Sequence, residues 1–404
     1  MDLPQNQLQG KPFSEIYLDC VQQFCNRHDE TGCVQPGING PHNEAETPLR
    51  NICHWIIALA GAYRLTNCSR YYAKAEELVA RLCSSELRPH GASYLARVSK
   101  GVDRCNGLIG QAWVLEALGE MSTLTGSTKF REIGIELVLR HKFAWKWSLW
   151  HSLDIDGRNL NIDNVFNHQL WFAATASMVN KGDSGEINAM IASFMNALDR
   201  NLTLDGHGYV AHHIDRIRSA PSVRLSGLMK HMRQGTVLQR LHRPKGTTNG
   251  IKDPALFKVG YQSFNAYGFA LLKRETRGHP FWGTNEVEKL TRILWSAEYL
   301  RSLRGNPFAF GYNPPGFEVP FALQELAVIP REKLALSITQ WISRQVHYSY
   351  DPYVKSMSRN APDPATQAAR LYEISRIAPE HLKETRIVVP DDAETLSRIP
   401  DMIN

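Results

Sequence analysis

The chain has 404 residues, 43% hydrophobic and 21% charged, so it can bury a large core and is not a disordered chain or a small disulfide-stabilised domain. The formal net charge is +6, and no segment reaches the roughly 18 consecutive apolar residues of a membrane span. No signal peptide is visible and the cysteines lack CxxC spacing, so we expect reduced thiols, a cytoplasmic protein and no membrane partner.

Helical periodicity dominates the chain from residue 47 onward. Thr47-Pro48 is typical of a helix start, and apolar residues then recur at spacings of three and four from 49 to 63. A partner helix is expected from about 70 to 83. The pattern repeats with helices over 108–118 and 129–139. These segments predict two consecutive helical hairpins.

The joints of the two hairpins, 66–71 and 125–130, share one pattern. Each places Asn or Gly, then Ser or Thr, then a basic and an aromatic residue, which is typical of one helix ending and the next beginning. Two more hairpins are expected, one pairing 168–179 with 185–198 and the other pairing 257–274 with 285–303. Six such hairpins would fill about 360 residues. The repeat therefore predicts an all-α (α/α)6 toroid, two concentric rings of helices around a funnel.

Few strands are expected. Residues 150–153 and 157–162 could form one short β-hairpin around Asp154-Ile155-Asp156-Gly157. We expect one toroid domain over residues 1–380 and a peripheral C-terminal tail over 381–404.

Four segments carry more polar and aromatic side chains than packing requires, and each stands at the start of an expected inner helix. They are 42–55, 103–113, 163–171 and 261–267. Aromatic rings stack on sugar faces, while amide, imidazole and guanidinium groups pair with hydroxyls. Sugar recognition is therefore expected, and the candidate binding residues in these segments are Arg50, His54, Trp55, Asn106, Trp113, Asn167, Gln169 and Trp171.

Positive charge is concentrated between residues 212 and 245. This block has one acid, Asp215, against eight basic residues: Arg216, Arg218, Arg224, Lys230, Arg233, Arg240, Arg243 and Lys245. A solvated basic loop is the plain interpretation, and an anionic partner is the functional one. Nucleic-acid-binding motifs are absent, so we expect an acidic carbohydrate as the partner, with Arg216 and Arg218 as further binding residues.

Two short motifs resemble those of known toroid enzymes. Asn167-His168, followed by tyrosines about a hundred residues later, resembles the Asn-His and Tyr elements of alginate and heparinase-like polysaccharide lyases. Asp103-Arg104-Cys105-Asn106-Gly107 with Trp113 is similar to an element of unsaturated glucuronyl and rhamnogalacturonyl hydrolases, with Cys105 in place of glycine. The resemblance implies a toroid enzyme that acts on uronic-acid-containing sugars.

β-Elimination is the first-ranked reaction. It needs a group that neutralises the uronate carboxylate, a base for the C5 proton and an acid for the leaving oxygen. Asn167, His168 and Tyr261 or Tyr267 can fill these roles. The plain alternatives are a capped helix start for His168 and core packing for the tyrosines.

A glycoside hydrolase of the unsaturated uronyl hydrolase type ranks second and a uronate C5 epimerase third. Hydrolysis needs carboxyl groups beside the bond, and Asp103 and Asp163 are the candidates, with Glu44 and Glu46 behind them. Glu46 stands four residues before Arg50, which also favours a plain helix-start ion pair.

No cofactor is expected. The sequence contains no HExxH, Walker or GxGxxG motif, and the His and Asp residues between 205 and 215 lack the spacing of a metal site. A non-catalytic helical scaffold that binds an anionic partner remains open. Polar and aromatic segments gathered at one rim would favour the enzyme over the scaffold.

Overall fold

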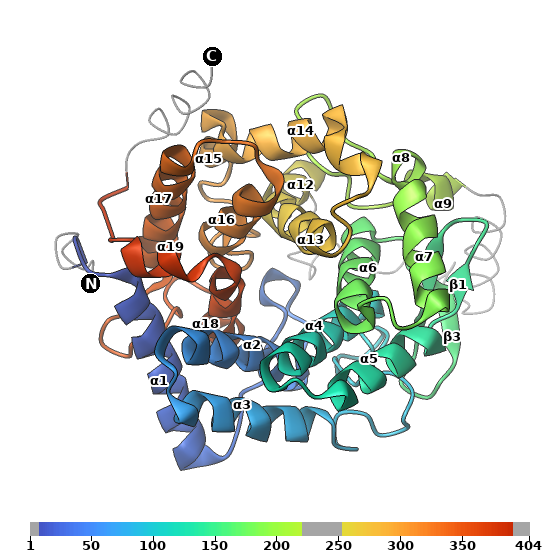
Figure 1. The fold of residues 1–404 in the computed structure, drawn as a ribbon, viewed down its shortest axis with the longest axis horizontal. Coiled ribbons are helices and arrows are strands. Elements are labelled where there is room, and N and C mark those ends of the chain that lie inside the picture. The colour runs from blue at the N-terminus through green and yellow to red at the C-terminus, as the bar shows by residue number, and fades with distance from the viewer. Residues whose placement is uncertain (1–7, 220–252, 391–404) are drawn as a thin grey trace, which may run out of the picture.

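The computed structural model describes residues 8–219 and 253–390. Within these ranges the chain forms an inner and an outer ring of helices around one axis (Figure 1). This arrangement confirms the predicted all-α toroid. In the described part of the chain, no helix has the length and apolar character that crossing a membrane requires.

The inner ring closes on itself. Each inner element contacts the next in chain order, and the last, η5, contacts both α16 and α2. The inner elements are α2 (Leu49–Thr66), α4 (Gly107–Thr125), α6 (Phe166–Asn180), α13 (Gln262–Glu275), α16 (Pro315–Leu326) and α18 (Pro364–Ala369) with η5 (Arg370–Arg376).

The outer ring packs around these elements (Figure 1). Its helices are α1 (Phe13–Thr31), α3 (Ser69–Leu82), α5 (Thr128–Arg140), α7 (Gly185–Asn196), α14 (Asn285–Arg292), α15 (Ala297–Ser302) and α17 (Arg331–Ser349). Shorter elements connect them: η2 (Gly40–His42), α8 (Leu198–Asn201), α9 (Asp215–Ser219), α12 (Pro254–Gly260), η3 (Pro280–Gly283), η4 (Ile293–Trp295) and α19 (Pro379–Glu384).

The expected helix joints lie where the sequence places them. Asn67 and Gly126 end α2 and α4 with φ of 57° and 70°, the left-handed conformation of a C-cap. The fourth expected hairpin differs, because both of its arms are interrupted. Its first arm breaks at Tyr261 between α12 and α13, and its second restarts at Ser296, whose side chain accepts a hydrogen bond from the Tyr299 N–H.

The strands form one small antiparallel sheet in the order β1-β2-β3, from β1 (Phe143–Ala144), β2 (Leu149–Leu153) and β3 (Asn159–Ile162). The expected short hairpin is therefore confirmed as β2 and β3. Asp154 and Gly157 make its turn, since the Gly157 N–H donates to the Asp154 carbonyl at 3.0 Å. The loop after β3 leads directly into α6.

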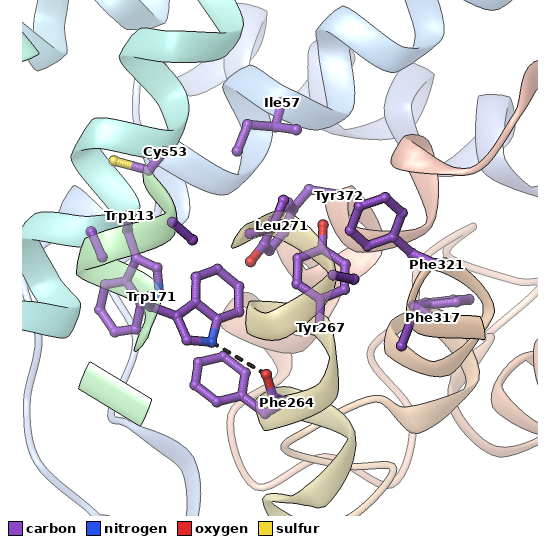
Figure 2. Close-up of a cluster of buried hydrophobic side chains, with 14 of the residues drawn as sticks. Cys53, Ile57, Trp113, Trp171, Phe264, Tyr267, Leu271, Phe317, Phe321 and Tyr372 are labelled. Atoms are coloured by element: carbon purple, nitrogen blue, oxygen red, sulfur yellow. Dashed lines mark hydrogen bonds between the residues drawn. The ribbon is translucent and has the colours of Figure 1, made fainter. Parts of the chain in front are cut away.

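Aromatic side chains fill the centre of the inner ring (Figure 2). Trp171 is stacked on Phe264 and on Tyr267, with ring centroids 4.6 and 5.4 Å apart. Gly268 lets α13 approach α6 closely, because a Cβ there would lie 2.9 Å from the Trp171 Nε1. This packing closes the axis of the toroid below the helix starts.

The two ends of the described chain lie together. The N–H of Phe13 donates to the Thr385 carbonyl at 3.0 Å, and the N–H of Gly10 to the Ile387 carbonyl at 2.7 Å. α19 also contacts α1. Residues 385–387, in the segment expected to form a tail, thus pair with the segment that opens the outer ring.

Candidate functional site

A cavity of about 180 Å³ lies where the inner-ring elements begin. All the inner elements named above contribute to its wall, from a first turn or from the residues just before it. The lining residues are Asn39, His42, Glu44, Arg50, Arg97, Asn106, Ile109, Trp113, Val165, Asn167, His168, His212, Phe257, Tyr261, Phe264, Tyr312, Asn313 and Arg370. Polar and aromatic groups are thus gathered at one end of the ring.

His168 and Asp163 form a hydrogen-bonded pair at this wall. His168 Nδ1 lies 2.8 Å from Asp163 Oδ2, and the N–H groups of Leu108 and Val165 donate to the same carboxylate. Burial alone would raise the pKa of Asp163, but the charge and hydrogen bond of His168 and the two N–H groups together lower it. An ionised Asp163 only accepts, so Nδ1 carries the proton. When Nε2 carries no proton, it is the ring atom that can act as a base.

The start of α4 is shaped to accommodate this pair. Asn106 and Gly107 both have positive φ, 57° and 54°. A Cβ at Gly107 would lie 2.5 Å from Asp163 Oδ2 and 2.9 Å from His168 Nδ1. Only glycine fits this backbone beneath the pair.

A second proton-transfer group lies in the same cavity. His42 Nε2 is 2.8 Å from the Tyr261 hydroxyl, which donates to the Tyr312 hydroxyl at 3.3 Å. Tyr312 in turn donates to Asn39 Oδ1 at 2.9 Å. Burial lowers the pKa of His42 and raises that of Tyr261 well above its ordinary value, so both groups are neutral near pH 7. Tyr261 can therefore act as a proton donor.

Arg50 brings positive charge that is only loosely compensated. Its guanidinium lies over the Trp113 ring, 4.5 Å from the centroid, and 3.6 Å from Glu46. Its Nε has no hydrogen-bond partner among the described residues. Burial raises the pKa of Glu46 to about 7 although Arg50 opposes the shift, so Glu46 is partly neutral at that pH. Arg50 can therefore receive an anionic group.

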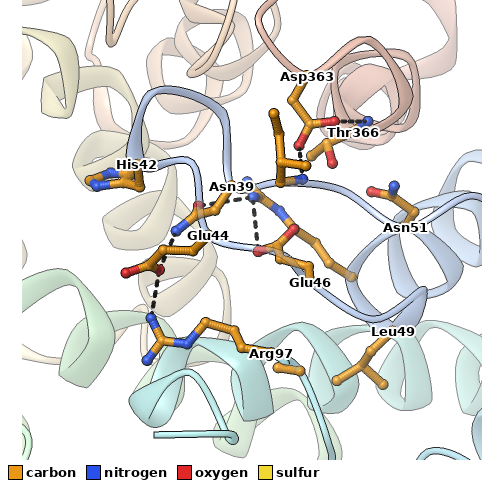
Figure 3. A network of polar contacts seen from close by, with 12 residues as sticks. Asn39, His42, Glu44, Glu46, Leu49, Asn51, Arg97, Asp363 and Thr366 are labelled. Carbon is orange, nitrogen blue, oxygen red and sulfur yellow. Dashed lines mark hydrogen bonds and ion pairs between the residues drawn. The ribbon is translucent and has the colours of Figure 1, made fainter. Parts of the chain in front are cut away.

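The other arginines at the cavity are more tightly paired. Arg97 donates to Glu44 at 2.8 Å and to Asp103 at 2.7 Å (Figure 3 shows the pair with Glu44). Arg370 is fully buried and forms ion pairs with Glu318 and Glu373. Among the described lining residues, Glu44 is the only one with a carboxyl group.

Seven of the candidate residues from the sequence line the cavity. They are His168, Tyr261, Asn167, Arg50, Asn106, Trp113 and Glu44. Asn167 is 3% exposed and its Oδ1 has no hydrogen-bond partner in the described structure, so it can accept from a ligand hydroxyl. Asp163 lies just behind this wall, where it contacts His168 Nδ1.

The remaining predicted residues lie elsewhere. Tyr267, Trp171 and His54 point into the aromatic core, where His54 is stacked on Tyr372. Gln169 is buried and binds the backbone of Trp150 and Asp163, and Asp103 binds Arg97 and the Gly107 N–H. Trp55 faces α1, where its ring is stacked on Phe24.

Within the described part of the basic block, His212 lines the cavity and Arg216 does not. Arg216 donates to Asn201 at 3.1 Å and lies over the Trp147 ring. The Arg218 side chain and the basic residues from Arg224 to Lys245 lie outside the described residues.

Sequence reasoning missed several lining residues. Tyr312, Asn313 and Arg370 belong to the last two inner elements, which the repeat analysis did not reach. His42 lay in a highlighted segment but was not assigned a role, and His212 was considered only as a metal ligand. Continuing the period of about 60 residues past α13 would have indicated the start of α16. In the described ranges no three His, Cys, Asp or Glu side chains are grouped as a metal site.

Fold and cavity together define an (α/α)6-toroid protein with a cavity lined by histidines, tyrosines and arginines. Three solved structures share the fold. They are cellobiose 2-epimerase from Bacillus thermoamylovorans (TM-score 0.57, 10% identity, 91% of this chain and 99% of that one), an unsaturated glucuronyl hydrolase specific for heparin (0.55, 12%, 90% and 96%) and a D-mannose isomerase (0.53, 13%, 90% and 97%).

The sequence comparison is more specific. The chain is 34% identical over 372 residues to archaeal glycosylation protein Q of Haloferax volcanii, and the alignment covers 90% of this chain and 97% of the relative. The chain belongs to the family of archaeal glycosylation protein Q. No protein-family model matches the sequence.

Proposed function

We propose that the protein is a glycan-modifying enzyme that removes the C5 proton of a uronic-acid residue. The observation that carries the proposal is the presence of two proton-transfer pairs, His168–Asp163 and His42–Tyr261, at one cavity that also holds Arg50. The name of the Haloferax relative supports a glycan as the substrate.

Each group has a chemical role in this reaction. His168 Nε2 takes the C5 proton, and Asp163 stabilises the imidazolium that forms. Arg50 binds the substrate carboxylate, onto which the electron pair of the broken C–H bond is delocalised. Tyr261 then gives up its proton, and the His42 contact stabilises the tyrosinate that remains.

Two outcomes share this first step. If Tyr261 protonates C5 from the other face, the residue is epimerised. If Tyr261 protonates the oxygen that leaves from C4, the glycosidic bond is broken by β-elimination. The cavity of about 180 Å³ is smaller than the roughly 300–1,000 Å³ of most small-molecule sites, which suits one sugar ring rather than a long polymer. Its size and the glycosylation relative favour epimerisation, and β-elimination is the second candidate.

Hydrolysis has weaker support from the geometry. Retaining and inverting glycosidases use two carboxyl groups that flank the bond. Glu44 is the one carboxyl-bearing residue among the described lining residues, and its Oε2 already accepts from Arg97 and Asn39. Asp163 is engaged by His168 and two backbone N–H groups.

The test follows the C5 proton directly. The protein is incubated in D2O with uronic-acid-containing oligosaccharides, and NMR measures the loss of the C5 proton signal, while ultraviolet absorbance detects the unsaturated product of elimination. We expect exchange that falls about 10²–10⁴-fold in His168→Ala and in Asp163→Asn. Tyr261→Phe removes the proposed proton donor. Its matched control is Tyr267→Phe, because Tyr267 lies in the core.

New reducing ends without deuterium exchange, lost in Glu44→Gln and kept in His168→Ala, would overturn the proposal in favour of hydrolysis. Neither exchange, absorbance nor reducing ends with any acidic glycan would favour a non-catalytic scaffold.

A further inference from the structure

A second and larger cavity lies outside the inner ring. Its volume is about 360 Å³, within the range of roughly 300–1,000 Å³ that small-molecule sites occupy. It opens between α1, the start of α2, the segment 354–358 and the start of α18. It shares no lining residue with the candidate active site.

Its wall combines an aromatic surface with a buried amide. Trp55 and Phe24 are stacked with ring centroids 4.0 Å apart and planes 10° from parallel. Asn51 is 1% exposed; its Nδ2 donates to the Gln35 carbonyl at 2.9 Å, while its Oδ1 has no hydrogen-bond partner within the described structure. A buried acceptor left without a donor costs about 1–3 kcal/mol, and a ligand hydroxyl or N–H would recover it.

The mouth of this cavity is positively charged. Arg27 is exposed, and in the described structure no carboxylate forms an ion pair with it. Lys355 also lines the cavity and is 3.2 Å from Asp19. Burial lowers the pKa of His28, so this ring is neutral near pH 7. The uncompensated charge at the mouth is therefore that of Arg27.

We propose that this cavity is a second binding site, for a sugar residue that carries an anionic group. The apolar face of the ring would lie against the aromatic wall, a hydroxyl would donate to Asn51, and the anion would pair with Arg27. The assignment does not depend on the reaction proposed above.

The segment 34–48 separates the two cavities. Val34 and Gln35 line the second cavity, whereas Asn39, His42 and Glu44 line the first. Figure 3 shows His42 and Asn51 at opposite ends of this segment's polar network. Asp363, the N-cap of α18, accepts from the Ile38 N–H at 2.8 Å and so ties the segment to the wall of the second cavity.

Calorimetric titration of the full chain with glucuronic acid, glucose 6-phosphate and glucose tests the proposal. The double variant His168→Ala/Arg50→Ala removes the anion-binding group of the candidate active site. We expect both anionic sugars to bind this variant at least tenfold more tightly than glucose, with affinities that fall as salt rises.

Arg27→Ala in the same background should weaken that binding at least tenfold, and Trp55→Phe should weaken it while keeping the contact with Phe24. Arg301→Ala, an exposed arginine on α15, is the matched control and should have no effect. Equal affinities in Arg27→Ala and Arg301→Ala would overturn the proposal, as would no binding to the double variant while its thermal unfolding is unchanged.

Discussion

A carboxyl group buried beside the candidate active site makes the stability of the protein depend on pH. Burial raises the pKa of Glu46 from 4.5 to about 7. The folded protein therefore binds this proton more tightly than the unfolded chain, so the free energy of unfolding falls as pH rises from 4.5 to about 7. Each pKa unit corresponds to about 1.36 kcal/mol, so Glu46 accounts for a fall in the unfolding free energy on the order of 3 kcal/mol over this pH range.

Glu46→Gln should make the pH dependence of stability shallower, because a neutral side chain then occupies the site at every pH. Urea unfolding at several pH values between 5 and 8 measures the slope. Part of the slope should remain, since burial also raises the pKa of Glu116 to about 7. Glu76→Gln, at an exposed position, should leave the slope unchanged. Parallel curves for Glu46→Gln and the unsubstituted protein would contradict this assignment.

Among the elements, the backbone conformation at the start of α4 is predicted to affect both the stability of the protein and the reaction. Gly107→Ala places a Cβ against Asp163 and His168 and forces alanine into a positive φ of 54°. Gly126→Ala is a matched control, because Gly126 has φ of 70° but no atom within 4 Å of the added Cβ. The positive φ alone should lower the unfolding free energy by about 1–2 kcal/mol in both variants, and the added contacts should make the loss larger in Gly107→Ala.

Only Gly107→Ala should also impair the reaction, because it alone displaces the Asp163–His168 pair. Denaturant unfolding and the C5 exchange rate measure the two effects separately. Full exchange activity in Gly107→Ala would show that the close approach at this helix start is unimportant for the chemistry.

The elements differ in how far the sequence predicts them. The joints at Asn67 and Gly126 carry local capping signals, so the first two hairpins were predicted within a few residues. The break at Tyr261 has no such signal. It coincides with Gly260, where an added Cβ would lie 2.4 Å from Phe308, and that contact depends on a segment nearly fifty residues later.

The candidate site could also be predicted only in part, because the sequence alone does not show which side chains of an inner helix face the cavity. Some residues in the first turn of an inner helix face the cavity, as Asn167 and His168 do. One turn further along, Trp171 and Tyr267 face the core, although their residue types equally suit a sugar site. An inner helix is buried on nearly all sides, so its hydrophobic pattern does not indicate which face meets the cavity.

For the whole molecule, pairing of the two ends is predicted to hold the rings closed. Deletion of residues 385–404 removes the backbone hydrogen bonds to Gly10, Lys11 and Phe13 and the fully buried Ile387. We expect the deletion to lower the unfolding free energy by several kcal/mol. Deletion of 391–404 alone leaves every described contact in place and is the control. Equal melting temperatures for the two truncated chains would contradict this role.

Closure of the inner ring also restricts how such a protein can change in length during evolution. An open stack of helical hairpins can gain or lose a unit at either end and keep its remaining interfaces. Here η5 contacts both α16 and α2, so an added or lost hairpin would change the curvature required at every other interface. Length should therefore vary in the loops between helices, and those at the helix starts surround the cavity. Sequence changes among relatives that keep the closed ring should therefore alter the ligand specificity of the cavity first.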